Sequence, residues 1–293
     1  MRHAVAVSPG HATLIFGKYD GGSIEESGSF GAGMSLYPGA ESEVFHDVNG
    51  GEKTEIIVEN NDGRIIENKD TSLSAISILR KKLSISGSIT VRTRLHLPLS
   101  QGFGMSAAGT MSACCALSFI CGGSELDAVK AAHAAEIQCG TGLGDVAGIM
   151  CGGLTARRKG GLPPACLPFV FPFEGEVLLA VVGPEIKTDS VIRGKMEKIT
   201  ASAAEAMKDI EGMEISGVFN RARRFANDSG LITPEVREAL AMLGEESASM
   251  VMIGNAVIML GNNQTIELPH AWRIFRARTD REGPRILRAG GRN

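Results

Sequence analysis

The sequence predicts an α+β fold, and three observations lead to this class. Residues 88–97 alternate between apolar and polar side chains, which predicts a strand with one buried face. Such a strand belongs to an antiparallel or mixed sheet covered on one side, whereas a doubly wound parallel sheet has strands that are apolar throughout. Short apolar segments broken by Gly and Pro fill the first sixty residues, while helical patterns dominate later ones.

The first half of the chain is predicted to begin with strands. Residues 21–22 and 27–33 are rich in Gly and Ser and are predicted to be loops, and Leu73–Leu83 has the pattern of a helix. The expected strands before that helix are Ala4–Val7, Thr13–Phe16, Met34–Leu36, Glu43–Phe45 and Glu55–Val58.

Three helices and a boundary are predicted in the middle of the chain. A helix of small residues follows the strand 88–97 and ends near Cys121, before Gly122. Ser124 begins the next helix with a capping box, and a short helix follows Asp145. The Pro- and Gly-rich segment 160–172 predicts a division into domains 1–165 and 166–293.

The second half is predicted to mix strands and helices. The expected helices are Asp189–Met207, Ile215–Asn227 and Thr233–Leu243, the last with Thr at its N-cap and Pro at its first position. The expected strands are Val177–Val182, Ser249–Ile253 and Val257–Leu260, followed by a closing hairpin of Trp272–Ala277 with Pro284–Leu287.

Charge and composition exclude several classes of partner. The net charge is −3, and the basic segment 273–292 is interpreted as a solvated tail or edge strand, so no nucleic acid partner is expected. The first apolar run stops at Ser8, too early for a signal peptide, and the helix 105–121 is too short and polar to cross a membrane. Six cysteines without a Cys-x-x-Cys spacing indicate a reducing compartment. We therefore expect a cytoplasmic protein without a membrane partner.

The loop after the alternating strand is the main candidate for a phosphate-binding site. Its two glycines allow backbone N–H groups to surround phosphate oxygens, and the following helix directs its N-terminal dipole at the same anion. A hydroxyl in the first turn can reach a phosphate-bound Mg²⁺. A Rossmann loop or a plain tight turn shares the glycine spacing, so both alternatives stay open. The expected nucleotide-binding residues are Gly102, Phe103, Gly104, Met105, Ser106, Ala107 and Ala108.

Two carboxylates follow this loop in the sequence. Glu136 lies on the apolar stripe of its helix, where it either binds Mg²⁺ together with Ser106 or caps a neighbouring loop. Asp145 comes nine residues later, after a glycine-rich segment. It either caps the short helix or orients a substrate hydroxyl during phosphoryl transfer.

Together these segments resemble the GHMP kinase superfamily. Ser8-Pro-Gly-His-Ala-Thr13 resembles its first motif, residues 98–108 its ATP-phosphate loop, and residues 249–255 occupy the place of its third motif. Gln101-Gly-Phe-Gly-Met-Ser106 and Thr141-Gly-Leu-Gly-Asp145 are similar to the archaeal pantoate kinase family within it. The first motif has His11 where many relatives have Lys, and the third keeps one glycine where a run is common.

The resemblance implies an N-terminal ATP-loop domain, a C-terminal ferredoxin-like domain, and transfer of the ATP γ-phosphoryl to pantoate for coenzyme A synthesis. It implies Mg²⁺ at Ser106 and Glu136, Asp145 as the catalytic residue, and a homodimer as one assembly. A cation for the pantoate carboxylate is expected from His11, Lys18 or Arg157, with Arg158 as a further candidate. Related kinases of homoserine, shikimate or mevalonate, and a silent ligand-binding relative, are the alternatives.

Overall fold

The computed structural model describes residues 1–186, 194–244, 248–261 and 267–291 and confirms the α+β class. The strands form one 11-stranded sheet. They are β1 Arg2–Tyr19, β2 Gly28–Asp47, β3 Thr54–Glu59, β4 Ser88–Leu95, β5 Leu154–Arg157, β6 Phe169–Val170, β7 Glu176–Val181, β8 Ala248–Val251, β9 Ala256–Leu260, β10 Arg273–Thr279 and β11 Arg285–Gly291. The helices are α1 Asp70–Lys82, α2 Met105–Ile120, α3 Glu125–Cys139, α4 Asp145–Cys151, α6 Met196–Ala206, α7 Ile215–Asp228 and α8 Pro234–Leu243, with a 3₁₀ turn at Ile210–Gly212.

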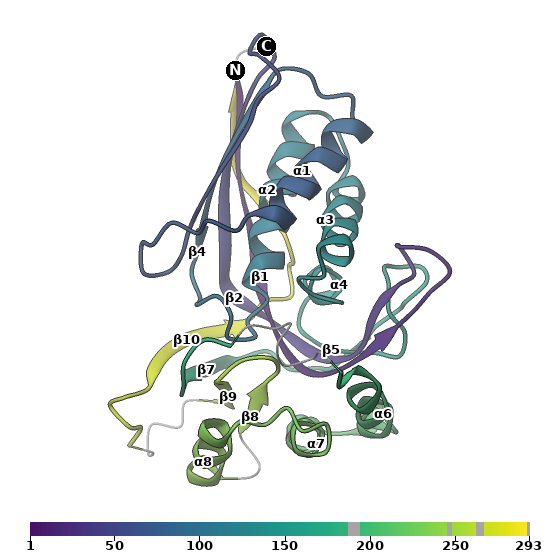
Figure 1. Ribbon diagram of the computed structural model, residues 1–293, viewed down its shortest axis with the longest axis vertical. Coiled ribbons are helices and arrows are strands. Elements are labelled where there is room, and N and C mark those ends of the chain that lie inside the picture. The colour runs from purple at the N-terminus through teal and green to yellow at the C-terminus, as the bar shows by residue number, and fades with distance from the viewer. Residues whose placement is uncertain (187–193, 245–247, 262–266, 292–293) are drawn as a thin grey trace.

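Two long antiparallel strands, β1 and β2, form the centre of the molecule (Figure 1). The short strands predicted in this region are parts of these two, and the loop predicted at 27–33 is wrong, because Gly28–Gly33 lie in β2. Glycine allows β1 and β2 to approach closely here. A Cβ on Gly31, at φ +146°, would lie 1.9 Å from the carbonyl oxygen of Ile15.

Helices α1, α2 and α3 cover one face of the upper sheet (Figure 1). The alternation predicted in β4 is confirmed, since Ile89, Val91, Thr93 and Leu95 are buried and Arg92 and Arg94 are exposed. The predicted helix ends near residues 121 and 139 and the capping box of α3 are also confirmed: Ser124 Oγ accepts from the N–H of Asp127, whose carboxylate accepts from the N–H of Ser124.

The lower part of the sheet has the strand order β10-β7-β9-β8, with all neighbours antiparallel and with α6, α7 and α8 beneath it (Figure 1). The predicted cap of α8 by Thr233, with Pro234 after it, is confirmed. The predicted helix from Asp189 is described only from its later part, α6, because residues 187–193 lie outside the described ranges.

The predicted closing hairpin is wrong. Strand β10 pairs with β7 and β2, whereas β11 pairs with β1 at the other edge of the sheet. Sequence proximity suggested a hairpin, but the buried Asp280 between the strands turns the chain instead: it accepts from the N–H of Glu282 and Gly283 and forms an ion pair with Arg285. This turn redirects the chain toward β1.

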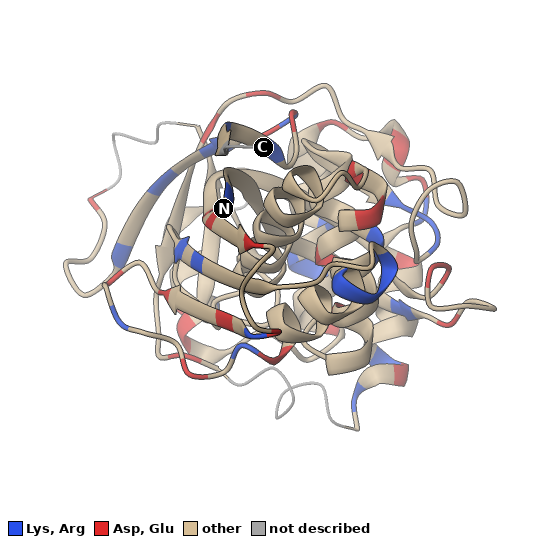
Figure 2. Cartoon of the chain, turned by 90° about the horizontal axis from the view of Figure 1, so that it is seen from above, with Lys and Arg blue, Asp and Glu red and all other residues tan. Residues whose placement is uncertain are grey.

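The sheet runs through both halves of the chain, since β2 pairs with β10 at Tyr37 and Leu36 and β1 with β11. The division into 1–165 and 166–293 stays a prediction. All six cysteines are free. None of the helices in the described ranges is long and apolar enough to span a membrane. Figure 2 shows that acidic and basic residues are interspersed along the chain in the view from above.

Candidate functional site

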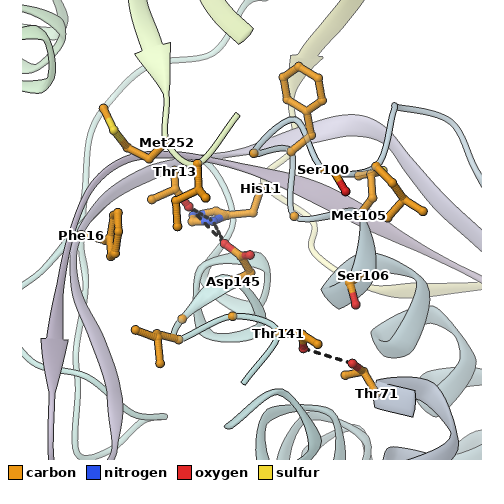
Figure 3. A pocket seen from close by; sticks show the side chains of 18 of the residues that line it. His11, Thr13, Phe16, Thr71, Ser100, Met105, Ser106, Thr141, Asp145 and Met252 are labelled. Atoms are coloured by element: carbon orange, nitrogen blue, oxygen red, sulfur yellow. Dashed lines mark hydrogen bonds and ion pairs between the residues drawn. The ribbon is translucent and has the colours of Figure 1, made fainter. Parts of the chain in front are cut away.

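One cavity of about 1180 Å³ lies where the two halves of the sheet meet. It is bounded by the start of α2, by β1, by the glycine loop before α4 and by the turn between β8 and β9 (Figure 3). Among the described residues, its lining contains a single acidic residue, Asp145, and the basic side chains of His11, Lys18, Lys69 and Arg157. This described lining therefore has one carboxylate and an excess of positive charge.

The predicted phosphate loop forms one wall of this cavity. Gly102 and Gly104 have φ angles of +81° and +62°, which glycine adopts without strain, and α2 begins directly after them. Residues 102–106 line the cavity, and the exposed Ser106 lies in the first turn of α2 (Figure 3). Ala107 and Ala108 are instead buried behind the loop and are not among the lining residues.

The loop is held from behind by Gln101, whose side chain is fully buried. Its Oε1 accepts from the backbone N–H of Asn255 at 3.0 Å, while its Nε2 has no partner among the described residues. Gly102 also packs tightly on the same turn, because a Cβ there would lie 2.5 Å from the carbonyl oxygen of Met252. The third-motif segment 252–255 thus supports the phosphate loop through packing and one hydrogen bond.

Asp145 is fixed by two side chains of β1 (Figure 3). Its Oδ1 lies 2.9 Å from Nδ1 of His11 and accepts from Oγ1 of Thr13 at 3.1 Å. A carboxylate only accepts, so Nδ1 of His11 carries the hydrogen. Among the described residues nothing donates to Oδ2, and the side chain is 25% exposed. Asp145 is the first residue of α4 but does not cap it; it presents one oxygen to the cavity.

His11 lies behind Asp145 in a slot built by two glycines. Its side chain is only 3% exposed. A Cβ on Gly33 or Gly148 would lie 2.4 or 2.3 Å from Nε2 of His11, so only glycine leaves room for the ring. The far nitrogen Nε2 is buried without a partner among the described residues.

Glu136 is buried and performs the capping that Asp145 does not. Its Oε1 accepts from the N–H of Asp145 at 3.2 Å and its Oε2 from the N–H of Val146 at 3.4 Å, which are the first two amides of α4. Burial, followed by the nearby charge of Asp145, raises the pKa of Glu136 to about 8. Gly142, which lines the cavity, packs against the Glu136 carboxylate. Glu136 itself is not among the lining residues.

Arg157 contributes a buried cation beside Asp145. The residue is 5% exposed, lines the cavity, and its Nη1 has no partner among the described residues. Its Nη2 lies 2.9 Å from where a Cβ of Gly144 would be, and Oγ of Ser29 lies 2.2 Å from the same point. Arg157 and Ser29 therefore meet next to the residue that precedes Asp145.

The other predicted cations are placed differently. Lys18 lies on the cavity wall with a half-exposed side chain that pairs with Asp20 at 2.8 Å. Arg158 forms an ion pair with Glu211 at 2.8 Å and donates to the carbonyl of Met207, so it joins β5 to the segment after α6.

Sequence reasoning missed Thr13, Ser29 and Gln101 as site residues. Thr13 and Gln101 lie inside two of the quoted motifs, so their positions were available but their roles depended on strand register and on the packing of the third motif. Ser29 lies in the segment predicted to be a loop, and its place beside Arg157 follows from the pairing of β2 with β5.

Comparison with known proteins agrees with this geometry. The profile of the GHMP kinases N terminal domain matches residues 70–153. The chain is 27% identical to the pantoate kinase of Methanospirillum hungatei, covering 98% of this chain and 97% of that one. It is 29% identical to the pantoate kinase of Thermococcus kodakarensis, covering 89% of each.

Two solved structures of phosphoryl-transfer enzymes superpose on nearly the whole chain. A phosphotransferase related to the CoA biosynthesis pathway superposes with a TM-score of 0.81 at 26% identity, covering 98% of both chains. Homoserine kinase from Cytophaga hutchinsonii superposes with a TM-score of 0.68 at 16% identity over 97% of both chains, which shows a shared fold. Residues 70–153 therefore match the GHMP kinases N terminal domain, and the chain is similar to pantoate kinases over nearly its full length.

Proposed function

We propose that this protein transfers the γ-phosphoryl group of ATP to the 4-hydroxyl of pantoate, giving 4-phosphopantoate and ADP as a step toward coenzyme A. The observation that carries the proposal is a cavity with a helix N-terminus at one end and, at the other, the one carboxylate of its described lining together with a buried guanidinium whose Nη1 has no partner among the described residues. These are the groups that a triphosphate and a hydroxy acid require.

The phosphate end supports ATP as the donor. The backbone of Gly102–Gly104 and the first turn of α2 offer N–H groups and a dipole to the phosphates, as in other helix N-terminal anion sites. Lys69 lies farther along the wall, with Nζ donating to the carbonyl of Ile56 at 2.6 Å.

The acceptor end supports a hydroxy acid and not an amino acid. The orphaned Nη1 of Arg157 calls for an acceptor atom, and a carboxylate suits a guanidinium in a bidentate geometry. An ammonium group such as that of homoserine would need a second acidic residue, and the described cavity lining has only Asp145. Pantoate, with a carboxylate and no ammonium, satisfies both conditions.

For the metal we propose Ser106 and Glu136 as the residues that hold Mg²⁺ with the phosphates. Ser106 presents its hydroxyl to the cavity, and Glu136 lies directly behind Gly142 next to Asp145. A buried carboxylate beside a second one is favourable for a cation, and Mg²⁺ uses one or two carboxylates plus phosphate oxygens. To ligate directly, Glu136 would exchange its bonds to the α4 amides. When bound, the metal neutralises charge on the transferring group.

In the proposed reaction, Asp145 accepts the proton of the acceptor hydroxyl. Because His11 and Thr13 hold Oδ1, the free Oδ2 is aimed to accept a hydrogen bond from the acceptor hydroxyl and to take its proton as the phosphoryl group transfers. We propose that His11 acts through Asp145, because its ring is only 3% exposed and its Nδ1 donates to that carboxylate. Lys18 remains a proposed contact at the rim.

The test is ADP release from ATP and Mg²⁺ with pantoate, homoserine, mevalonate, shikimate and pantothenate assayed in parallel. Turnover confined to pantoate is expected. Turnover with another acceptor would keep the kinase chemistry but replace the substrate. ATP binding without turnover of any acceptor would favour the silent ligand-binding relative instead.

A further inference from the structure

An apolar wall lines the acceptor end of the cavity and has no role in the reaction described above. Its members are Phe16 on β1, Met196 at the start of α6 and Met252 in the turn after β8, which we call the acceptor wall. Figure 3 shows Phe16 and Met252 on the side of Asp145 that faces away from Ser106. In this view Asp145 lies between these two side chains and Ser106. The backbone of Met252 also packs against Gly102 of the phosphate loop.

Hydrogen bonds and register fix the wall to the groups that bind the acceptor. The N–H of Met252 donates to the carbonyl of Thr13 at 2.8 Å, and the side chain of Thr13 donates to Asp145. Phe16 pairs with Gly31 across β1 and β2, and Gly31 pairs with Arg157 across β2 and β5, so the ring and the guanidinium lie in one row of the sheet.

The wall is also rigid. The ring of Phe16 packs edge-on against Phe225 of α7, with centroids 5.9 Å apart and planes at 78°. Met252 is 2% exposed, and the turn it belongs to carries Asn255, whose N–H is bound by Gln101. A rigid apolar surface discriminates between hydrocarbon shapes better than a mobile one, because it does not refill the space left by a missing methyl.

We infer that the acceptor wall selects acceptors whose central carbon carries two methyl groups, which in pantoate is C3. This inference rests on the proposed function. An acceptor that places its hydroxyl at Asp145 and its carboxylate at Arg157 has only its middle carbons left to contact the wall. The expected preference follows from the burial of methyl groups, since one methylene in such a pocket changes discrimination by about 10- to 200-fold.

The experiment compares kcat/KM for pantoate and for 2,4-dihydroxybutanoate, which has the same chain without the two methyls. We expect the wild type to prefer pantoate by at least about tenfold and the Met252→Ala and Phe16→Leu variants to lose most of that preference. The ratio of two acceptors on one enzyme is insensitive to the fraction of folded protein. Val58→Ala, in a residue that lines the cavity on β3, is the matched control and should leave the ratio unchanged.

The outcomes separate the two claims. A wild type that turns over pantoate and the unbranched acid with equal kcat/KM overturns the acceptor wall and leaves the proposed function intact. A preference for pantoate that persists in both Met252→Ala and Phe16→Leu also overturns the acceptor wall and leaves the proposed function intact. A wild type that turns over neither acid overturns the proposed function itself. If Phe16→Leu fails to fold because of its packing on Phe225, Met252→Ala still decides the question.

Discussion

The two ends of the cavity offer different parts of the chain to the proposed ligands. At the phosphate end, the proposed contacts are backbone amides and a helix dipole, and the supporting side chain, Gln101, lies behind the loop. At the acceptor end, the proposed contacts are side chains: Asp145 is fixed by two residues of β1, and Arg157 comes from β5. The first end tolerates side-chain change as long as the loop keeps its shape, whereas the second depends on single functional groups.

The largest effect should therefore come from the acceptor end. Asp145→Asn keeps the size of the side chain but cannot take a proton, so kcat should fall by about 10²- to 10⁴-fold. The dissociation constant for ATP, measured by calorimetry, should stay within about twofold, because the proposed phosphate contacts come from the backbone of Gly102–Gly104 and the first turn of α2 and not from Asp145. An unchanged kcat would remove Asp145 from the mechanism and weaken the contrast between the two ends.

A smaller effect is expected from the support of the phosphate loop. Gln101→Met removes the acceptor for the N–H of Asn255, and a buried N–H left unpaired costs about 1–3 kcal/mol. The loop should be less well held, so the KM for ATP should rise by about tenfold while the KM for the acceptor changes by less than twofold. Equal shifts in both KM values would show that Gln101 serves general stability and does not support one end.

A further effect, on stability and not on substrate binding, concerns Glu136, which lies behind Gly142 next to Asp145. In the folded state the pKa of Glu136 is raised from 4.5 to about 8. Between pH 4.5 and about pH 8, Glu136 is therefore protonated in the folded state and ionised in the unfolded state. Its contribution to the free energy of unfolding is therefore complete below about pH 4.5 and is lost as the pH rises through about 8. Denaturant titrations should show a flatter pH dependence for Glu136→Gln.

The same variant separates capping from metal binding. If Glu136 is a ligand, Glu136→Gln and Ser106→Ala should both raise the Mg²⁺ concentration that gives half-maximal activity. If Glu136 only caps α4, that concentration should change for Ser106→Ala alone, and Glu136→Gln should affect thermal stability. A requirement for Mg²⁺ that shifts in neither variant would remove both residues from the metal site.

The difference between the ends also explains what could be predicted from the sequence. The phosphate loop is a continuous segment, so its glycines, the helix after it and Ser106 were predictable from local pattern. The acceptor end is assembled from β1, β2, β5 and α4, and its geometry depends on register, which local pattern does not give. Ser29 shows this most clearly, because local composition indicated a loop at a position that lies in β2.

Fold-level errors had the same origin. The hairpin predicted for the last two strands failed because their partners are strands far away in the sequence. The alternation in β4 and the caps of α3 and α8 were predicted correctly because each depends on residues within one turn or one strand. Asp145 was predicted with two alternative roles, and the neighbours contributed by β1, which local pattern does not give, support the proposed role in the reaction.

The pairing of β1 with β11 has a consequence for how the protein is made. Arg2 pairs with Gly291, so nearly the whole described chain must leave the ribosome before this edge of the sheet can close. Contacts of such long sequence separation form late, and an open strand edge can pair with other chains in the meantime. During synthesis, protection of the nascent β1 edge, by a chaperone or by rapid completion, should determine how much protein reaches the native state.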